Sequence, residues 1–418
     1  MLYRRVAGTK DILPEEVCFW QKIEEASRRI FSLYNYLEIR APLIEEEPLF
    51  NRSLGPSSEI VQKQMFLMKN KDETYVLRPE GTASIVRAYV ENHLDKALGF
   101  AKFYYLGPMF RLERPQKGRL RQFHHIGCEA IGSYDPDVDV EIISLAGNLL
   151  KGFSISGYVI KLNSLGCARD KKELSSILHK GLKDKLSKLC EDCQKRFKAN
   201  ALRILDCKNE TCQEVVRELD IKDSYLCPDC LKHFNQVKEG LDSLKIKYTV
   251  APYLVRGLDY YTRTVFEITH KDLGAQDALG AGGRYDNLVK ELGGPDVGAM
   301  GFAFGVERLL LVQGACLVGR QARCEVQGKS LTYLISLGQE AEREGIKILE
   351  NLRKNGIACD TDYESKSLKG AMRRANDLNA RFVLILGEDE LKKNVVTVKD
   401  MTSGEQKEVT QQELLKEL

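Results

Sequence analysis

Several features that would assign a chain of 418 residues to a class at once are missing from this one. No apolar run approaches the roughly 20 residues that a membrane-spanning helix needs. The N-terminal stretch MLYRRVAGTKDILPEE lacks the apolar core of a secretory signal. The net charge of +3 is too small to identify a nucleic-acid-binding protein, so any such surface must be local. We therefore expect a cytoplasmic protein that does not contact a membrane.

The sequence also has no phosphate-binding loop of the form G-x-x-x-x-G-K-[ST]. A nucleotide, if one binds, would therefore be held by side chains. What is present describes an ordinary globular protein, with 43% hydrophobic and 29% charged residues. The length is sufficient for two or three domains, each with its own core.

The stretch from Tyr104 to Ser133 is the most unusual part of the chain. Two extended segments flank a basic middle that contains Arg111, Arg114, Lys117, Arg119 and Arg121. The second segment alternates with period two, which puts Arg121, Phe123, His125, Gly127, Glu129 and Ile131 on one strand face. Charged side chains on one face are costly to bury without partners. The pattern fits an edge hairpin with a charged outer face, or a hairpin that grips a polyanion and a small polar ligand.

The spacing of apolar residues predicts an α+β organisation. Residues 1–167 and 246–318 contain helices and many strands joined by hairpins, which indicates a mainly antiparallel sheet flanked by helices. Residues 168–245 are rich in Lys, Leu and Cys and helical in period, so they are predicted to be a helical insertion. Residues 315–328 are predicted to be a linker. From Leu331, strands alternate with helices, so residues 329–418 are predicted to form a separate α/β domain with a largely parallel sheet.

Six cysteines fall within the predicted insertion. Cys190-Glu-Asp-Cys193 and Cys227-Pro-Asp-Cys230 are C-x-x-C pairs, a spacing typical of zinc sites in cytosolic chains. Cys207 and Cys212 are two further possible ligands. The pairs predict a structural zinc site formed by Cys190, Cys193, Cys227 and Cys230. The alternative is that these cysteines act as small hydrophobic residues inside a helical segment.

Six motifs then give the chain a family resemblance. They are GTKDILP at 8–14, LRPEGTA at 77–83, FRLERPQKGRLRQF at 110–123, RGLDYY at 256–261, GGRYDNL at 282–288 and GFAFGVERL at 301–309. Together they closely resemble the histidyl-tRNA synthetases, which are class II aminoacyl-tRNA synthetases. The resemblance covers nearly the whole chain, with residues 329–418 similar to the anticodon-binding domain of that subclass.

The resemblance implies a reaction in two steps. ATP, with Mg²⁺, would activate L-histidine to histidyl-adenylate, and histidine would pass to tRNA-His with release of AMP and pyrophosphate. It also implies a homodimer whose interface is built by the first class II motif, near Tyr36–Phe50. The alternative is a non-catalytic, synthetase-like regulatory subunit of histidine biosynthesis. Such subunits usually lack the anticodon domain, and residues of their motifs are replaced. In this chain Arg111, Arg256 and Arg308 are present.

Three residues are expected to bind ATP. An arginine such as Arg111 can fork onto a phosphate or a carboxylate. By resemblance, Arg111 contacts the α-phosphate and the carboxylate of histidine, Glu113 meets the adenine amino group, and Arg308 stacks on adenine. Arg256 of RGLDYY would assist at the α-phosphate, so Arg111 and Arg256 are the expected catalytic residues. For Arg308, a salt-bridged arginine at a helix start is the alternative.

The histidine pocket must recognise an imidazole, which offers one donor and one acceptor when neutral, and an ammonium group. The resemblance assigns histidine binding to Glu80, Gly81, Thr82, Arg111, His125, Glu129, Arg256, Tyr260 and Tyr261. Glu129 and Tyr261 would contact the ring nitrogens, while Glu80 and Thr82 would hold the α-amino group. The alternative is that Glu80 and Glu129 are acidic residues on the protein surface.

One position departs from the family pattern. Bacterial relatives usually have His-Gln after RQF, where this chain has His124-His125. A neutral His125 can accept a hydrogen bond from the substrate ammonium, but a protonated one would repel it. The sequence therefore predicts that histidine affinity falls below about pH 6.5, near the ordinary pKa of imidazole.

Contacts to tRNA are expected at two places. By resemblance, Arg114 and Gln116 at the hairpin tip lie near the acceptor end, and the insertion clamps the acceptor stem. Lys369, Arg373 and Arg374 of the C-terminal domain fit either phosphate contacts or a solvated helix face.

Overall fold

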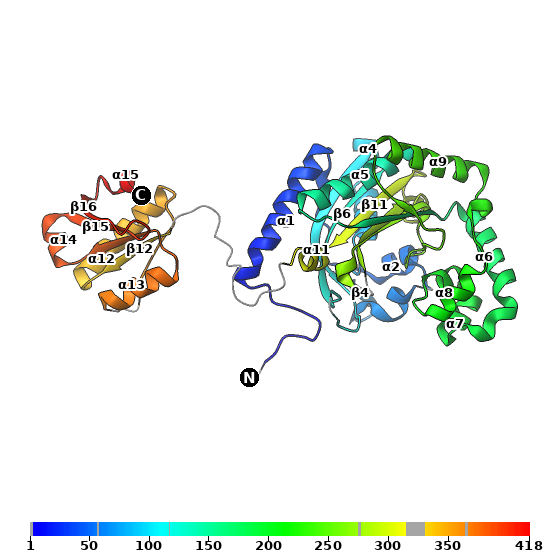
Figure 1. Cartoon of the computed structure of the whole chain (residues 1–418), viewed down its shortest axis with the longest axis horizontal. Coiled ribbons are helices and arrows are strands. Elements are labelled where there is room, and N and C mark those ends of the chain that lie inside the picture. Colours follow the sequence, from blue (N-terminus) through cyan, green and yellow to red (C-terminus); the bar gives the residue numbers. More distant parts are fainter. Residues whose placement is uncertain (1–2, 57, 117, 275–276, 315–330, 364–366) are drawn as a thin grey trace. The chain divides into compact units, whose positions relative to one another are not determined.

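The computed structural model describes residues 3–56, 58–116, 118–274, 277–314, 331–363 and 367–418. Its contacts divide the chain into two compact units, Met1–Ala322 and Arg323–Leu418, each shown in Figure 1. The predicted linker at 315–328 and Lys117 of the hairpin lie outside the described residues. None of the helices in these ranges is both long and apolar enough to span a bilayer.

An eight-stranded sheet forms the body of the first unit. Its strands run in the order β1 (Leu37–Glu38), β5 (Ala101–Phe110), β6 (Gln122–Ile131), β11 (Ala299–Gly305), β10 (Ala278–Arg284), β9 (Thr262–Thr269), β7 (Val159–Ser164) and β8 (Thr249–Val250). Only the two edge pairs, β1 with β5 and β7 with β8, are parallel. The prediction of a mainly antiparallel sheet is therefore confirmed.

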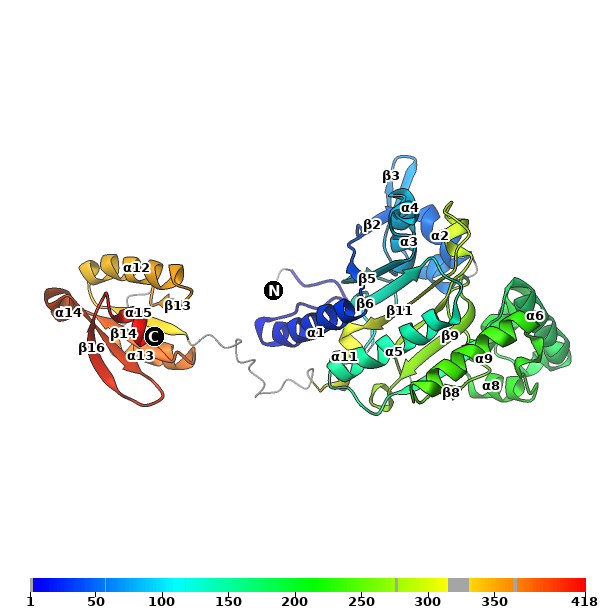
Figure 2. The same ribbon diagram turned by 90° about the horizontal axis from the view of Figure 1, so that it is seen from above.

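Helices cover one face of this sheet. They are α1 (Pro14–Leu33), α5 (Pro136–Gly152), α9 (Pro228–Ser243) and α11 (Val306–Val312). Figure 2 shows α1, α5 and α9 side by side, and α5 contacts both of the others. Each of the three begins with a proline in its first turn and acidic residues beside it, both of which favour a helix N-terminus. Their apolar stripes and the sheet enclose a core that includes Ile23, Leu145, Leu149 and Val237.

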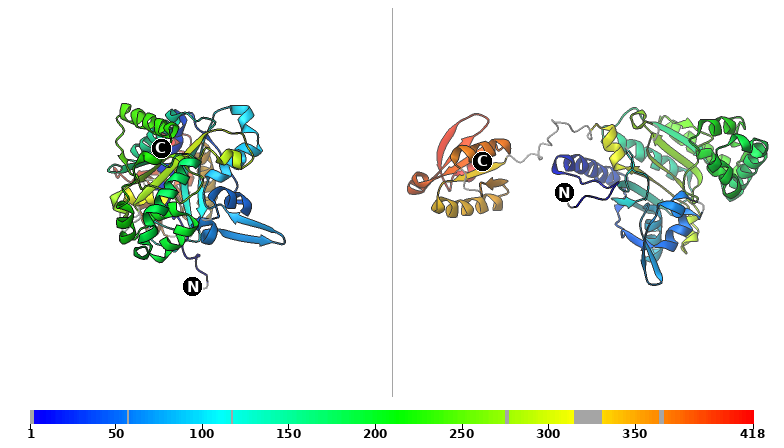
Figure 3. Two further views of the ribbon diagram at one scale, coloured as in Figure 1. Left: turned by 90° about the vertical axis from the view of Figure 1, so that its right-hand side faces the viewer. Right: turned by 90° about the horizontal axis from the view of Figure 1, so that it is seen from below.

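A smaller layer closes the sheet near the hairpin. It contains α2 (Glu47–Leu54), η1 (Ile60–Gln64), α3 (Thr82–Glu91), α4 (Leu94–Leu98), α10 (Leu288–Glu291) and a three-stranded sheet of β2 (Ile44–Glu46), β4 (Glu73–Leu77) and β3 (Phe66–Asn70). The short η5 (Lys271–Leu273) contacts α11 instead. The β3–β4 hairpin extends away from the body of the unit (Figure 3). Strand β3 was not predicted, because its residues are largely exposed and give no apolar period.

The insertion is entirely helical, as predicted. It consists of α6 (Ala168–Leu182), η2 (Lys183–Lys188), α7 (Glu191–Ala199), η3 (Ala201–Asp206), α8 (Glu210–Arg217), η4 (Asp223–Tyr225) and the start of α9. Helix α9 returns to the sheet, where Phe234, Val237 and Leu241 join the core under α5. The insertion is therefore anchored at its C-terminal end by one continuous helix.

The second unit has a five-stranded sheet in the order β13 (Cys359–Thr361), β12 (Thr332–Ser336), β14 (Phe382–Leu386), β15 (Val395–Asp400) and β16 (Gln406–Thr410). Helices α12 (Gln339–Lys354), α13 (Leu368–Asp377), α14 (Glu388–Lys393) and α15 (Leu414–Glu417) complete it. The expected parallel pairing holds for β12 with β13 and β14. Strands β15 and β16 are antiparallel instead, because only the residues from 401 to 405 join them, too few for a parallel crossover.

Candidate active site

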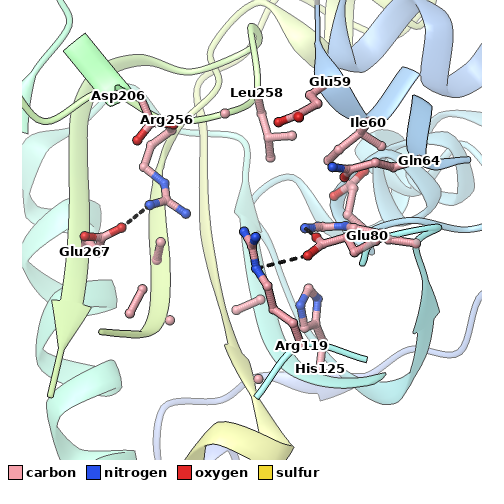
Figure 4. Close-up of a pocket in the computed structure, with 18 of the residues that line it drawn as sticks. Glu59, Ile60, Gln64, Glu80, Arg119, His125, Asp206, Arg256, Leu258 and Glu267 are labelled. Carbon is pink, nitrogen blue, oxygen red and sulfur yellow. Dashed lines mark hydrogen bonds and ion pairs between the residues drawn. The ribbon is translucent and has the colours of Figure 1, made fainter. Parts of the chain in front are cut away.

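A cavity of about 600 Å³ lies over the centre of the large sheet. Its walls come from the β5–β6 hairpin, strands β10 and β11, the start of α3, the RGLDYY segment and the insertion. Figure 4 shows Arg256 and Glu267 on one side, with Glu80, Arg119 and His125 on the other. Strands of the large sheet, the start of α3, the RGLDYY segment and the insertion therefore meet at a single concave surface.

Arg111, Arg256 and Arg308 are among the arginines that line this cavity, and each is held in place by the surrounding chain. The Nε of Arg111 donates to the carbonyl oxygen of Pro79 at 2.9 Å, and its guanidinium lies over the ring of Phe123, 5.2 Å from the centroid. Arg308, at the start of α11, donates from Nε to the carbonyl of Gly118 and from Nη1 to that of Ala278.

The third arginine, Arg256, donates from Nη1 to the carboxylate of Glu267 (Figure 4). Its Nε is buried and has no hydrogen-bond partner among the described residues. Glu113 belongs to the same region, with one carboxylate oxygen 3.0 Å from Nε of Arg119 and the other 3.8 Å from Nη1 of Arg111. The guanidiniums of Arg111, Arg256 and Arg308 converge on one cavity and create a site for a polyanion such as a nucleoside triphosphate.

The acidic side of the cavity is built by the start of α3. Glu80 is buried, and its two carboxylate oxygens accept the backbone N–H groups of Thr82 (2.7 Å) and Ala83 (2.9 Å). The pKa of Glu80 is raised by burial, although these two N–H bonds act in the opposite direction. A glycine is required at position 81, between Glu80 and Thr82, because a Cβ there would lie 2.5 Å from the ring of Tyr105. Each oxygen keeps a lone pair with which a ligand ammonium can bond.

Glu129 lies deeper than expected from its strand face. It is completely buried and is not among the residues that line the cavity. Its carboxylate accepts three hydroxyl groups, from Thr82 (2.8 Å), Tyr105 (3.3 Å) and Tyr285 (2.5 Å). Burial raises the pKa of Glu129 to about 8, even though the hydroxyl donors lower it. The Glu129 carboxylate therefore positions the side chains of Thr82, Tyr105 and Tyr285, which line the cavity.

Tyrosines form the wall next to this carboxylate. Tyr260 and Tyr261 line the cavity, with their ring centroids 4.7 Å apart, and Tyr260 meets Tyr285 edge-on at 5.7 Å. Burial raises the pKa of Tyr261 to about 12, so its hydroxyl keeps its proton at neutral pH and can donate a hydrogen bond. The sequence prediction had included Tyr260 and Tyr261 but missed Tyr105 and Tyr285. Tyr285 belongs to the GGRYDNL motif, so its presence there was an available signal.

His125 lines the cavity and is neutral. Burial, together with the guanidiniums of Arg111, Arg78 and Arg308, lowers the pKa of its imidazole to about 3. Its Nδ1 is buried without a hydrogen-bond partner within the described chain. The expected loss of histidine affinity below about pH 6.5 is therefore wrong, because His125 does not take up a proton in that range.

The remaining predicted residues lie outside the cavity or apart from one another. Arg114 and Gln116 are exposed at the hairpin tip, next to the isolated bridge between Gln116 and Arg119. The four predicted zinc ligands do not form one site. Cys190 and Cys193 group with two other cysteines, and Cys227 and Cys230 with a different set. The physical reason is that each C-x-x-C pair begins a different helix, α7 or α9.

The insertion contributes one whole wall of the cavity, which the sequence did not indicate. Lys195, Arg196 and Arg203 line it. The Nη2 of Arg203 donates to Asp259, within RGLDYY, at 2.9 Å. Basic residues of a helical insertion look like a solvated face in sequence, so this contact was not predictable.

An antiparallel sheet that brings these groups around one cavity defines the catalytic core of a class II aminoacyl-tRNA synthetase. A family profile described as Histidyl-tRNA synthetase matches residues 8–309, and one described as Anticodon binding domain matches residues 332–418. The histidine–tRNA ligase of Natranaerobius thermophilus is 44% identical over 98% of this chain and 97% of the relative. That of Thermosipho melanesiensis is 45% identical over 98% and 96%. The chain therefore belongs to the histidyl-tRNA synthetase family.

A solved structure agrees with this assignment. The crystal structure of apo S. aureus histidyl-tRNA synthetase superposes with a TM-score of 0.80 at 34% identity, covering 100% of this chain and 99% of that one. The predicted α+β fold with a C-terminal anticodon-binding domain is thereby confirmed.

Proposed function

We propose that this protein activates L-histidine with ATP and transfers it to tRNA-His, releasing AMP and pyrophosphate. The observation that carries the proposal is that one cavity brings together two chemically different sets of groups. Glu80, Tyr260 and Tyr261 supply acceptors and hydroxyls, while Arg111, Arg256 and Arg308 supply positive charge. A small amino acid with an α-ammonium group and a polyanionic nucleotide fit such a combination.

Histidine recognition would use the acidic and hydroxyl-bearing side. The carboxylate of Glu80 would receive the substrate α-ammonium, and the neutral His125 would accept a hydrogen bond from the same group. Tyr260 and Tyr261 would enclose the imidazole, with the Tyr261 hydroxyl bonding a ring nitrogen. Glu129, predicted from the sequence to contact a ring nitrogen itself, would instead orient the hydroxyls that contact the other ring nitrogen, because Thr82 and the tyrosines already donate to it.

Adenylate formation would need charge neutralisation and not proton transfer. An oxygen of the histidine carboxylate attacks the α-phosphorus in line, and the bond from that phosphorus to pyrophosphate breaks. Arg111 would hold both the carboxylate and the α-phosphate, and Arg256 would stabilise the charge on the phosphoryl centre. Arg308 would bind adenine and the γ-phosphate, with Glu113 near the adenine amino group.

Mg²⁺ is expected to enter with ATP. Within the described residues, no group of three or more metal-ligating side chains lies among the cavity's carboxylates. The ion would therefore be held mainly by the phosphates of ATP, with single carboxylates such as Glu267 completing its shell. When bound, it offsets phosphate charge.

Transfer to tRNA would follow at the same site. A hydroxyl of the terminal ribose attacks the carbonyl carbon of the adenylate, and AMP leaves. Arg114 and Gln116 at the exposed hairpin tip would meet the acceptor end. The anticodon-binding domain, with Lys369, Arg373 and Arg374 on or beside α13, would contact the other end of the tRNA.

Assembly and location follow from the same proposal. We assign residues 1–167 and 246–318 to the catalytic core, 168–245 to the insertion and 329–418 to the anticodon-binding domain. The protein would act in the cytoplasm as a homodimer, with the region near Tyr36–Phe50 at the interface.

The competing function is a non-catalytic regulatory subunit. It is not favoured, because relatives named histidine–tRNA ligase match over nearly the full length, including the anticodon-binding domain. Charging of purified tRNA-His with labelled histidine separates the two. A synthetase gives histidine- and ATP-dependent charging that is lost in Arg111→Ala, whereas a regulatory subunit leaves the tRNA uncharged.

A further inference from the structure

We infer that the insertion holds two zinc ions, in two separate sites that differ in their ligands. The first, the four-cysteine cluster, consists of Cys190, Cys193, Cys207 and Cys212. The second, the Cys₃Asp cluster, consists of Cys167, Asp170, Cys227 and Cys230. In each cluster, all four potential ligand atoms lie within 4.8 Å of one another. Four ligands of this kind are what a structural zinc site requires.

The spacing of the sulfur atoms fits a single tetrahedral ion. With Zn–S bonds of about 2.3 Å, neighbouring sulfurs of a tetrahedron lie about 3.8 Å apart. The Sγ atoms of Cys190 and Cys207 are 3.9 Å apart. Disulfide-bonded sulfurs lie about 2.05 Å apart, and all seven cysteines of the two clusters are free thiols. The four-cysteine cluster therefore has the dimensions of a metal site and not of a disulfide pair.

The same local pattern begins three helices. Cys190 and Cys193 open α7, Cys227 and Cys230 open α9, and Cys167 and Asp170 open α6. Each pair is separated by two residues, which brings both side chains to the first turn of the helix. The positive end of a helix favours thiolates and carboxylates over their neutral forms. Cys167-x-x-Asp170 is thus a C-x-x-D counterpart of the two C-x-x-C pairs.

Backbone N–H groups already point at the proposed ligands. The N–H of Cys190 donates to Sγ of Cys212 at 3.2 Å, and that of Asn209 to Sγ of Cys207 at 3.5 Å. In the second cluster, the two oxygens of Asp170 accept the N–H groups of Cys167 (3.2 Å) and Cys227 (3.1 Å). Hydrogen bonds of this kind orient metal ligands and offset their charge.

Asp170 is the most telling member, because its carboxylate is buried among thiols. It is 1% exposed, and it forms a long ion pair of 3.7 Å with the exposed Arg169. A carboxylate is rarely buried unless it is paired or coordinates a metal. Asp170 also closes the capping box at the start of α6, so its second role is shown by the three cysteines gathered around it. A cation within the Cys₃Asp cluster accounts for this grouping of one carboxylate with three thiols.

The four-cysteine cluster also adjoins the proposed active site, and this step rests on the proposed function. Asp192 lies between Cys190 and Cys193, Asp206 and Lys208 flank Cys207, and all three line the cavity. Arg203, on η3 just before Cys207, bonds Asp259. The first zinc would therefore be a positioning element that holds one wall of the cavity, and the second would fix α6 against α9.

Metal content of the full-length chain tests the two sites. The protein is purified in reducing buffer without chelator, and zinc is measured by inductively coupled plasma mass spectrometry. We expect two zinc ions per chain, one for each cluster. Cys193→Ser and Cys230→Ser should each reduce the content to one, and Asp170→Asn should weaken retention at the second site only. Cys359→Ser, a cysteine of the other unit, is the matched control and should retain both.

A second measurement uses wild-type protein, so it tests the two sites even if the variants fail to fold. Titrating wild-type protein with a mercurial reagent should release both ions, followed with a metallochromic dye. Cobalt substitution should give thiolate-to-metal absorption in the near ultraviolet for both sites. Wild-type protein with no bound zinc and freely reactive thiols would overturn the inference. The inference would also be overturned if wild-type protein held one zinc per chain and both Cys193→Ser and Cys230→Ser lost it. Neither result depends on tRNA charging, so the failure of these sites is distinguishable from failure of the proposed function.

Discussion

Replacing Glu129 with glutamine should remove a loss of stability that wild-type protein suffers as pH rises, and it should lower the activity. Glu129 is completely buried, and its pKa is raised from 4.5 to about 8. An unfolded chain releases this proton near pH 4.5, whereas the folded protein keeps it until about pH 8. The folded state therefore loses stability as pH rises through this interval. A glutamine of the same size does not titrate and removes this loss.

The magnitude follows from the two pKa values. Between pH 5 and pH 7.5, wild-type protein should lose about 3 kcal/mol relative to Glu129→Gln. For a unit of this size that corresponds to about 4 °C in Tm. Comparing the two proteins across pH cancels the constant effect of altered hydrogen bonds, so only the titration of Glu129 contributes to the change.

Activity should move in the opposite direction. Hydroxyl groups of Thr82, Tyr105 and Tyr285 all donate to this carboxylate. An amide has one oxygen and one NH₂ group, so it cannot accept all three donors. Leaving a buried donor unsatisfied costs about 1–3 kcal/mol, so kcat/KM for histidine should fall roughly 10- to 100-fold.

The assay is differential scanning calorimetry from pH 5 to pH 7.5, with histidine-dependent pyrophosphate exchange at neutral pH. Glu91→Gln, an exposed carboxylate at the end of α3, the helix that carries Thr82, is the control and should change neither quantity. A difference in Tm between wild type and Glu129→Gln that is constant with pH would refute the reasoning.

Three further predictions concern the cavity. Arg256→Ala should slow adenylate formation by about 10²–10³-fold while histidine binding changes less than tenfold; Arg256→Lys should recover part of the loss, and near-normal exchange in the alanine variant would contradict the role. His125→Gln should give the same pH profile of KM for histidine as wild type from pH 5 to pH 8, since the pKa of His125 is about 3; a wild-type profile that alone steepens below pH 6.5 would count against this. Gly301→Ala puts a Cβ 1.8 Å from the Glu129 carboxylate and should lower Tm by about 2–4 °C. Gly305→Ala, whose nearest contact would be 3.6 Å, should leave Tm unchanged, and equal Tm values for the two would argue against overpacking.

Short motifs in fixed order made much of the cavity predictable. Arg111, Arg256 and Arg308 were expected around one ligand, and the structure brings all three to the cavity wall. Glu80 could be placed because LRPEGTA marks a strand that turns into a helix, where an acid caps the first N–H groups. Local sequence is sufficient for such residues, because their surroundings lie within a few positions along the chain.

Residues whose environment comes from distant elements were less predictable. Strand alternation gives the face of Glu129 but not its depth, which depends on Thr82, Tyr105 and Tyr285 from other elements. The same is true of His125, whose pKa is lowered by burial and by arginines from three separate parts of the chain.

The cysteines show the same limit. Their spacing reveals two C-x-x-C pairs, but packing decides which residues complete each cluster. Asp170 was missed because a search for cysteine ligands does not include a carboxylate in the C-x-x-D position.

Histidine-dependent exchange of labelled pyrophosphate into ATP, without tRNA, tests the central claim most directly. It isolates adenylate formation, the step for which the arginines and the acidic groups of the cavity must act together. We predict exchange that requires L-histidine, is not supported by the other amino acids, and falls by about 10²-fold or more in Arg256→Ala. Absence of exchange in wild-type protein that binds both histidine and ATP would contradict the account.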